Sequence, residues 1–298
     1  MSWKSAPAML AAAAVLLSAC GLSSRPQAAS GGVAVVAAEN FWGSIAAEVG
    51  GDRVSVDSIV TNPDTDPHSY DPTPADARAF AGAAYVIVNG AGYDAWSSKL
   101  LAANPVGGRL ELDVSRLAGV SDGGNPHVWY SPDIVSRVVD RIASDLDQLD
   151  PAGASYFDEQ AGSYKTAGLK GYHDAIAAIK ARYSGVPVGA TESIFAWMAP
   201  ALGLDLITPP GYMKAISEGA DPSPADKITV DAQVARKLIR LLVFNAQNTT
   251  PDVNSLVDKA RSEGIPVVAI TETLTPASTT FQDWQAAQLE ALLSALGG

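Results

Sequence analysis

The sequence has few of the side chains that form disulfides or bind soft metals, and few positive charges. It contains one cysteine and three histidines in 298 residues, and 20 Lys and Arg against 32 Asp and Glu give a net charge of −12. A single cysteine excludes an intramolecular disulfide. The acidic balance argues against nucleic acid as a partner, because phosphate backbones are bound by basic surfaces. A chain of this length with 47% hydrophobic residues can form two domains with substantial cores.

Long hydrophobic runs are also missing. The apolar run of residues 8–17 follows Lys4 and is too short for an ordinary transmembrane span. It ends in Leu17-Ser18-Ala19-Cys20, which resembles the lipobox of bacterial lipoproteins, where the cysteine is lipidated and becomes the first mature residue. We therefore expect a signal peptide over residues 1–19 and a flexible Ser/Ala/Gly/Pro tether over residues 20–32. The tether favours a lipidated Cys20 over a buried or incidental cysteine. This arrangement attaches the protein by lipid to the outer face of a cytoplasmic membrane.

Short β-branched runs alternate with helical patterns in both halves of the chain. This alternation predicts an α/β fold of two lobes, each with about four βα units and a parallel sheet. The predicted lobes are residues 33–154 and 184–298, joined by a single long helix over residues 155–183. The predicted strands are residues 33–37, 54–60, 85–88, 110–112, 186–190, 204–207, 239–244 and 267–270.

Several local signals fix the expected helices. The linking helix is about 40 Å long at 1.5 Å per residue, and its internal glycines argue against a perfectly regular rod. Ser131-Pro132 and the segment Asp221-Pro222-Ser223-Pro224 have the cap-then-proline form of a helix start. Asn40 is expected to cap a helix over residues 41–49, and the residues between 207 and 221 read as a proline/glycine loop.

Two of the three histidines share an unusual local context. His68 lies in Asp66-Pro67-His68-Ser69-Tyr70-Asp71-Pro72-Thr73-Pro74, and His127 lies in Asn125-Pro126-His127-Val128-Trp129. Because proline fixes φ and lacks an amide donor, each imidazole is held in an ordered loop. Imidazole is the commonest transition-metal ligand, so the shared context favours a metal site over two loop histidines without a function.

Ligands of parallel α/β sheets bind outside the carboxyl ends of the strands. Acidic or imidazole groups just past these ends, two from each half, are His68, His127, Glu192 and Glu272. Two imidazoles and two carboxylates form a set suited to Mn, Fe or Zn, in a cleft between the lobes.

Other readings of the acidic residues remain open. Glu192 could be a charge at a helix N-terminus, and Glu272 a solvated loop acid. Asp226 and Asp283 are then alternative fourth ligands. The third histidine, His173, is expected on the surface of the long helix.

Residues 33–298 resemble the zinc/manganese solute-binding lipoproteins of ABC transporters, whose two lobes are bridged by one long helix. The motifs around His68 and His127 carry the resemblance, together with Thr191-Glu192-Ser193 and Thr271-Glu272-Thr273. The family usually has aspartate at the last position and often glutamate where Asp71 stands. The resemblance implies one divalent ion, Mn²⁺ or Zn²⁺, as the transported ligand, an ABC permease as the partner and a monomeric protein. The absence of a His-rich loop favours manganese.

Two further function classes stay open. A two-histidine, one-carboxylate site could be a metalloenzyme, but the sequence has no HExxH and no serine nucleophile motif. An adhesion lipoprotein is the other alternative. Four protein ligands fit holding an ion better than activating water, because catalytic sites keep a coordination position open. The metal content of the purified protein, with a test for turnover, separates the classes.

Overall fold

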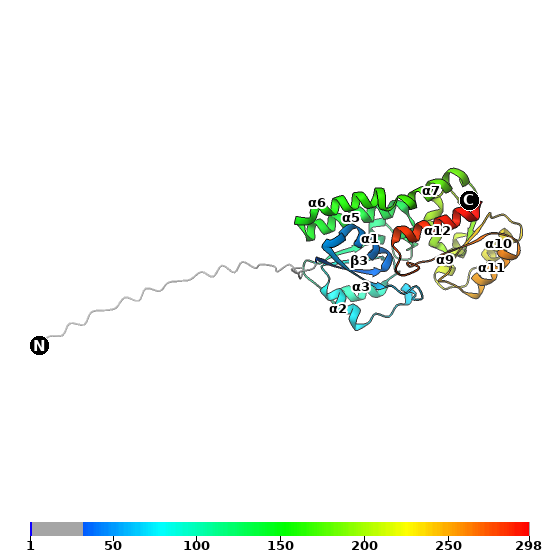
Figure 1. The fold of residues 1–298 in the computed structure, drawn as a ribbon. Coiled ribbons are helices and arrows are strands. Elements are labelled where there is room, and N and C mark those ends of the chain that lie inside the picture. The colour runs from blue at the N-terminus through cyan, green and yellow to red at the C-terminus, as the bar shows by residue number, and fades with distance from the viewer. Residues whose placement is uncertain (2–31, 298) are drawn as a thin grey trace.

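The computed structural model describes Met1 and residues 32–297. The predicted lipidation site, Cys20, lies outside the described residues. The described chain forms two four-stranded parallel sheets with helices packed around them, as Figure 1 shows. The predicted α/β class is confirmed.

Both sheets have the same strand order, with the first strand of each placed second. In spatial order, the first sheet contains β2 (Val54–Val60), β1 (Val33–Glu39), β3 (Tyr85–Val88) and β4 (Leu110–Asp113). The second contains β6 (Asp205–Leu206), β5 (Pro187–Ala190), β7 (Leu242–Asn245) and β8 (Val267–Ile270). All six strand pairings are parallel. The strand order reverses direction at β1/β3 and at β5/β7, so each sheet opens a crevice at those carboxyl ends.

Helices follow the strands in both halves. Around the first sheet lie α1 (Asn40–Gly50), α2 (Pro74–Gly82), α3 (Ala95–Ala103), α4 (Val114–Ala118) and α5 (Pro132–Leu149). Around the second lie α8 (Met198–Ala201), α9 (Pro210–Ser217), α10 (Pro224–Ala235), α11 (Pro251–Ser262) and α12 (Phe281–Leu296). The predicted helix starts before α5 and α10 are confirmed, since Ser131 and Ser223 cap them and a proline follows each cap.

The long linking helix is present but is interrupted. It consists of α6 (Ala154–Ser163), a π-helical turn (Tyr164–Gly168) and α7 (Lys170–Tyr183). Together these segments run along one side of the molecule from the first sheet to the second (Figure 1). The π turn contains Gly168, one of the glycines that argued against a regular rod.

The C-terminal helix α12 begins beside α1 of the first half and runs back towards the second sheet. It packs against α7, and its first turn meets α1, where the Phe281 amide donates to Ser44 Oγ at 2.9 Å. One hydrophobic core runs through both halves, with Phe41 and Trp129 on one side and Phe281 and Val188 on the other. Both halves of the chain therefore share packing well beyond the linking helix.

Three local expectations were wrong. The expected loop between 207 and 221 contains α9, because Pro209 and Pro210 stand at its start, where a missing amide proton costs nothing. The strand expected over residues 239–244 spans Leu242–Asn245. Asn40 does not cap α1; it is the first helical residue, and its Oδ1 accepts from the Leu274 amide at 3.3 Å.

Candidate metal centre

The four predicted ligands lie in loops on the carboxyl side of strands; Glu192 and Glu272 come directly after strand ends, whereas α4 lies between β4 and His127. His68 is in a 3₁₀ turn after β2, and His127 follows β4 at the start of another 3₁₀ turn. Glu192 follows β5, and Glu272 follows β8. Because all strands are parallel, the carboxyl ends of each sheet share one edge. Residues that follow these ends in both halves, including His68 and Glu272, line one hollow.

Three of these side chains converge closely. One ligand atom each from His68, His127 and Glu272 lies within 4.8 Å of the others. His127 and Glu272 are buried, 1% and 8% exposed, whereas His68 is exposed. The cluster therefore has two fixed interior groups and one group on the solvent side.

Glu192 stands beside this cluster rather than within it. It is 1% exposed, and its Oε1 is buried without a hydrogen-bond partner. Burial, reinforced by the nearby charge of Glu272, raises the pKa of Glu192 to about 8. This buried oxygen lies beside three converging ligand atoms and has no hydrogen-bond partner. A cation bound there would satisfy it.

The two histidine loops are fixed by their own side chains. Asp66 Oδ1 accepts from the His68 amide at 2.9 Å, and the His68 ring packs edge-on against Tyr93 with centroids 4.6 Å apart. Asn125 Oδ1 lies 2.7 Å from His127 Nδ1, which leaves Nε2 as the free ring nitrogen. Burial, with a smaller effect of His68, lowers the pKa of His127 to about 3, so this imidazole is neutral.

Glu272 is held by groups from both halves of the chain. Tyr93 Oη donates to its Oε2 at 2.9 Å, and Asn245 Nδ2 donates to its Oε1 at 2.6 Å. Burial raises the pKa of Glu272, although His68 and these two hydrogen bonds oppose the shift. The carboxylate is thus oriented before any ligand arrives.

Three carboxamide side chains, one at the end of β7 and two in the loop after it, lie around the two glutamates and were not predicted from the sequence. In Asn245-Ala246-Gln247-Asn248, Asn245 binds Glu272, and Asn248 Nδ2 donates to Glu192 Oε2 at 2.9 Å. Gln247 Oε1 accepts from the Glu272 amide at 2.5 Å. Their position at a strand end is the signal that could have identified them, because it is the same position that marks Glu192 and Glu272.

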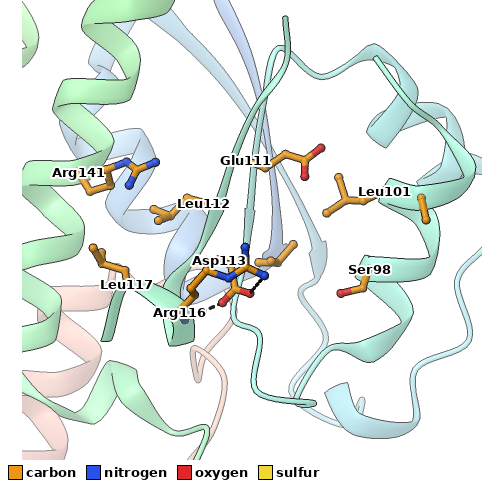
Figure 2. Close-up of a pocket in the computed structure, with 10 residues that line it drawn as sticks. Ser98, Leu101, Glu111, Leu112, Asp113, Arg116, Leu117 and Arg141 are labelled. Carbon is orange, nitrogen blue, oxygen red and sulfur yellow. Dashed lines mark hydrogen bonds and ion pairs between the residues drawn. The ribbon is translucent and has the colours of Figure 1, made fainter. Parts of the chain in front are cut away.

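Two hollows that share His68 as a lining residue lie at the cluster. One of about 710 Å³ is lined by His68, Glu272 and the carboxamide loop, and one of about 490 Å³ by His68, His127 and α9. A third hollow, of about 680 Å³, lies beside the edge strand β4, between α3 and α5, as Figure 2 shows. Its Arg116 pairs with Asp113 at 3.7 Å, and none of the predicted ligands lines it. The hollows at the cluster are therefore the candidate site.

The third histidine and the two alternative fourth ligands lie away from the cluster. His173 is exposed on α7, as expected. Asp226 and Asp283, the alternative fourth ligands, each lie in the first turn of their own helix and accept from its capping hydroxyl, Ser223 or Thr280. Within the described residues, the cluster that could hold a metal includes neither of them.

The fold and this cleft define a two-lobed solute-binding protein. The chain belongs to the family of the zinc-uptake complex component A, periplasmic, whose profile matches residues 35–295. It is 27% identical over 206 residues to the manganese-binding lipoprotein MntA of Halalkalibacterium halodurans, covering 65% of this chain and 66% of that protein. It is 25% identical over 260 residues to the metal ABC transporter substrate-binding lipoprotein FimA of Streptococcus parasanguinis, covering 81% and 80%.

Solved structures share the fold. A Mn-bound periplasmic metal-binding protein from Candidatus Liberibacter asiaticus superposes with a TM-score of 0.73 at 19% identity, over 88% of this chain and 98% of that one. The solute-binding protein FpvC from Pseudomonas aeruginosa, in complex with Mn²⁺, gives a TM-score of 0.69 at 18% identity, over 88% and 97%. The two-sheet architecture with its linking helix is therefore that of periplasmic metal-binding proteins.

Proposed function

We propose that this protein captures one divalent transition-metal ion, Mn²⁺ or Zn²⁺, outside the cytoplasm and delivers it to an ABC permease. His68 and His127 supply two nitrogen ligands from the first half, and Glu192 and Glu272 supply carboxylates from the second. The family consists of binding components of uptake systems, so the protein is not an enzyme.

One observation carries the proposal: His68, His127 and Glu272 converge within 4.8 Å from three separate loops. The free Oε1 of the buried Glu192 supports the fourth position. Once both acids lose their protons, the two carboxylates balance the charge of a divalent ion, and the two imidazoles add nitrogen ligands. Such a set suits Mn²⁺ and Zn²⁺ alike, and the Irving–Williams order makes Zn²⁺ bind more tightly whichever ion is the cargo.

Calorimetric titration of the chelator-treated protein tests this function. We expect one site per chain for Mn²⁺ and for Zn²⁺, with Zn²⁺ tighter, and no site for Mg²⁺, which prefers an all-oxygen octahedral shell. A protein that binds neither Mn²⁺ nor Zn²⁺ would contradict the proposal.

The manganese assignment draws support from the names of relatives, which include a manganese-binding lipoprotein, whereas the family description names zinc. The metal content of protein purified from cells grown with equal Mn²⁺ and Zn²⁺ shows which of the two ions the protein retains. Uptake measured in a strain lacking this chain identifies the ion that is delivered.

We further propose that lipid on Cys20 holds the protein at the outer face of the membrane. The relatives named lipoproteins support this anchor. Among the described residues, no helix is long and apolar enough to cross a bilayer. Cys20→Ala should release the protein or block its maturation; a variant that still sediments with membranes in high salt would contradict the anchor.

A further inference from the structure

Gln247 uses both ends of its carboxamide to join two loops of the candidate site. Its Oε1 accepts from the amides of Glu272 and Thr273, at 2.5 and 3.1 Å. Its Nε2 donates to Thr273 Oγ1 at 2.8 Å and to the carbonyl oxygen of Pro63. Pro63 lies in the loop that carries His68, so one side chain from the second half binds the first histidine loop and the Glu272 loop together.

The orientation of this carboxamide is determined by its partners. Two backbone N–H groups face Oε1, so rotating the amide by 180° would set N–H against N–H. With Oε1 fixed there, Nε2 must point at the Pro63 carbonyl. The bonds to the Glu272 loop thus orient Gln247 so that its Nε2 donates to the His68 loop.

The His68 loop is otherwise held by its own half of the chain. Trp96 Nε1 donates to the Pro67 carbonyl at 3.2 Å, and Asp66 binds the His68 amide. The second histidine loop has its own tie across the cleft, because Asn125 Nδ2 donates to the Ser193 carbonyl at 2.7 Å. His127 is nonetheless buried, and His68 is the exposed member of the cluster.

We propose that Gln247 is a positioning residue that ties the His68 loop to the Glu272 loop and thereby sets the rate at which bound metal leaves. The inference rests on the proposed metal site. An ion released to solvent must lose the exposed His68 before the three buried ligands, since only that ligand can swing outwards without opening the core. When the loop moves outwards together with His68, the bond from Gln247 to Pro63 breaks, so this bond slows release.

Two substitutions distinguish the effect of the Gln247–Pro63 hydrogen bond on release from the effect of side-chain packing. Gln247→Met keeps the length and removes every hydrogen bond. Gln247→Glu keeps an oxygen for the amides of Glu272 and Thr273 but replaces the donor to Pro63 with an acceptor. Electrostatics alone would make Gln247→Glu hold a cation longer, so faster release from it can only follow from losing the tie.

The experiment measures Mn²⁺ release by stopped flow with a chelator in excess. We expect release three- to tenfold faster for both variants, because both lose the one hydrogen bond to Pro63 that crosses to the His68 loop, with the association rate unchanged. Gln282→Met is the matched control. Gln282 also bridges the two halves, with Nε2 donating to Glu48 at 2.8 Å, but it lies in α12 and does not touch the site loops. This control should release Mn²⁺ at the wild-type rate.

Hydrogen exchange of the metal-free protein gives a second readout. The Asp64 and Thr65 amides are bonded to Asn62 within the His68 loop, and we expect them to exchange faster in Gln247→Met. Unchanged release and exchange in both Gln247 variants, while wild-type protein binds Mn²⁺, would overturn this inference alone. A wild-type chain without metal binding would overturn the proposed function and with it the role in release.

Discussion

His127 and Glu192 show opposite effects of burial on two candidate ligands. Burial lowers the pKa of the imidazole to about 3 and raises the pKa of the carboxyl to about 8. Near pH 7 the imidazole is ready to bind, and the carboxyl carries a proton. A metal ion that enters the site therefore displaces a proton from the Glu192–Glu272 pair and not from His127.

Mn²⁺ affinity should consequently rise with pH, by about tenfold per unit between pH 6 and 7, because about one proton is released on binding. Titrations in two buffers of different ionisation enthalpy count that proton directly. Mn²⁺ affinity that stays constant from pH 6 to 8 would contradict the prediction that Glu192 carries a proton in the metal-free protein.

The metal-free protein should show the reverse trend in stability. Glu192 has a pKa of about 8 when folded and an ordinary value of 4.5, so its contribution is lost as pH rises through 8. His127 adds no change above its ordinary value of 6.5, since it is neutral there both folded and unfolded. Thermal unfolding should therefore occur at a lower temperature at pH 8 than at pH 6.5, and Mn²⁺ should stabilise the protein more at pH 8.

Single substitutions test the ligand set. His68→Ala, His127→Ala and Glu192→Ala should each weaken Mn²⁺ binding at least about tenfold, or about 1.4 kcal/mol. Glu272→Ala should weaken it as well, and Glu272→Asp only mildly.

His173→Ala is the matched control and should bind like the wild type, because His173 is exposed on α7. Unchanged affinity in both His68→Ala and His127→Ala would refute the metal site. Unchanged affinity in Glu272→Ala alone would replace Glu272 in the ligand set by another group or by water.

At the scale of elements, the loop after β7 is the part of the centre that the sequence prediction did not include. Asn248 in this loop binds the carboxylate of Glu192, and Asn245 at the end of β7 binds that of Glu272. The histidines could be predicted because rare residues recurred beside prolines. The carboxamides are common residues whose role depends on which strand β7 lies beside, and that placement between β5 and β8 is set by tertiary structure.

The Asn248–Glu192 hydrogen bond gives a specific prediction. This bond lowers the pKa of Glu192, so Asn248→Ala should raise it further. Mn²⁺ binding at pH 7 should weaken by about tenfold, the effect of one hydrogen bond to a charged group, and the deficit should shrink above pH 9. A deficit that is the same at both pH values would mean that Asn248 acts on packing alone.

Strand and helix types were largely predictable, and the errors share a cause. α9 was read as a loop because Pro209-Pro210-Gly211 breaks a helix interior, yet here the prolines stand where the helix begins. The π turn in the linking helix could not be located, since the glycines allow an irregularity without fixing its position. The start of α9 and the position of the π turn both depend on which apolar side chains pack into the core.

At the scale of the whole molecule, the shared core limits how far the cleft can open. Hydrophobic residues of both halves form one cluster, and α12 packs on α7 and meets α1. The predicted lobe boundaries, residues 33–154 and 184–298, stay a prediction, because this core crosses them. Solution scattering of metal-free and Mn²⁺-loaded protein should give nearly the same radius of gyration, whereas a large compaction on loading would point to a hinge at the π turn.

The central claim is that four side chains from the two halves hold one metal ion. A crystal structure of the Mn²⁺-loaded protein, with the ion located by its anomalous scattering, tests it most directly. We predict a single strong peak within about 2.0–2.3 Å of His68, His127, Glu192 and Glu272, close to the usual lengths of nitrogen and carboxylate bonds to such ions. A peak elsewhere, or one bound by neither histidine, would contradict the account.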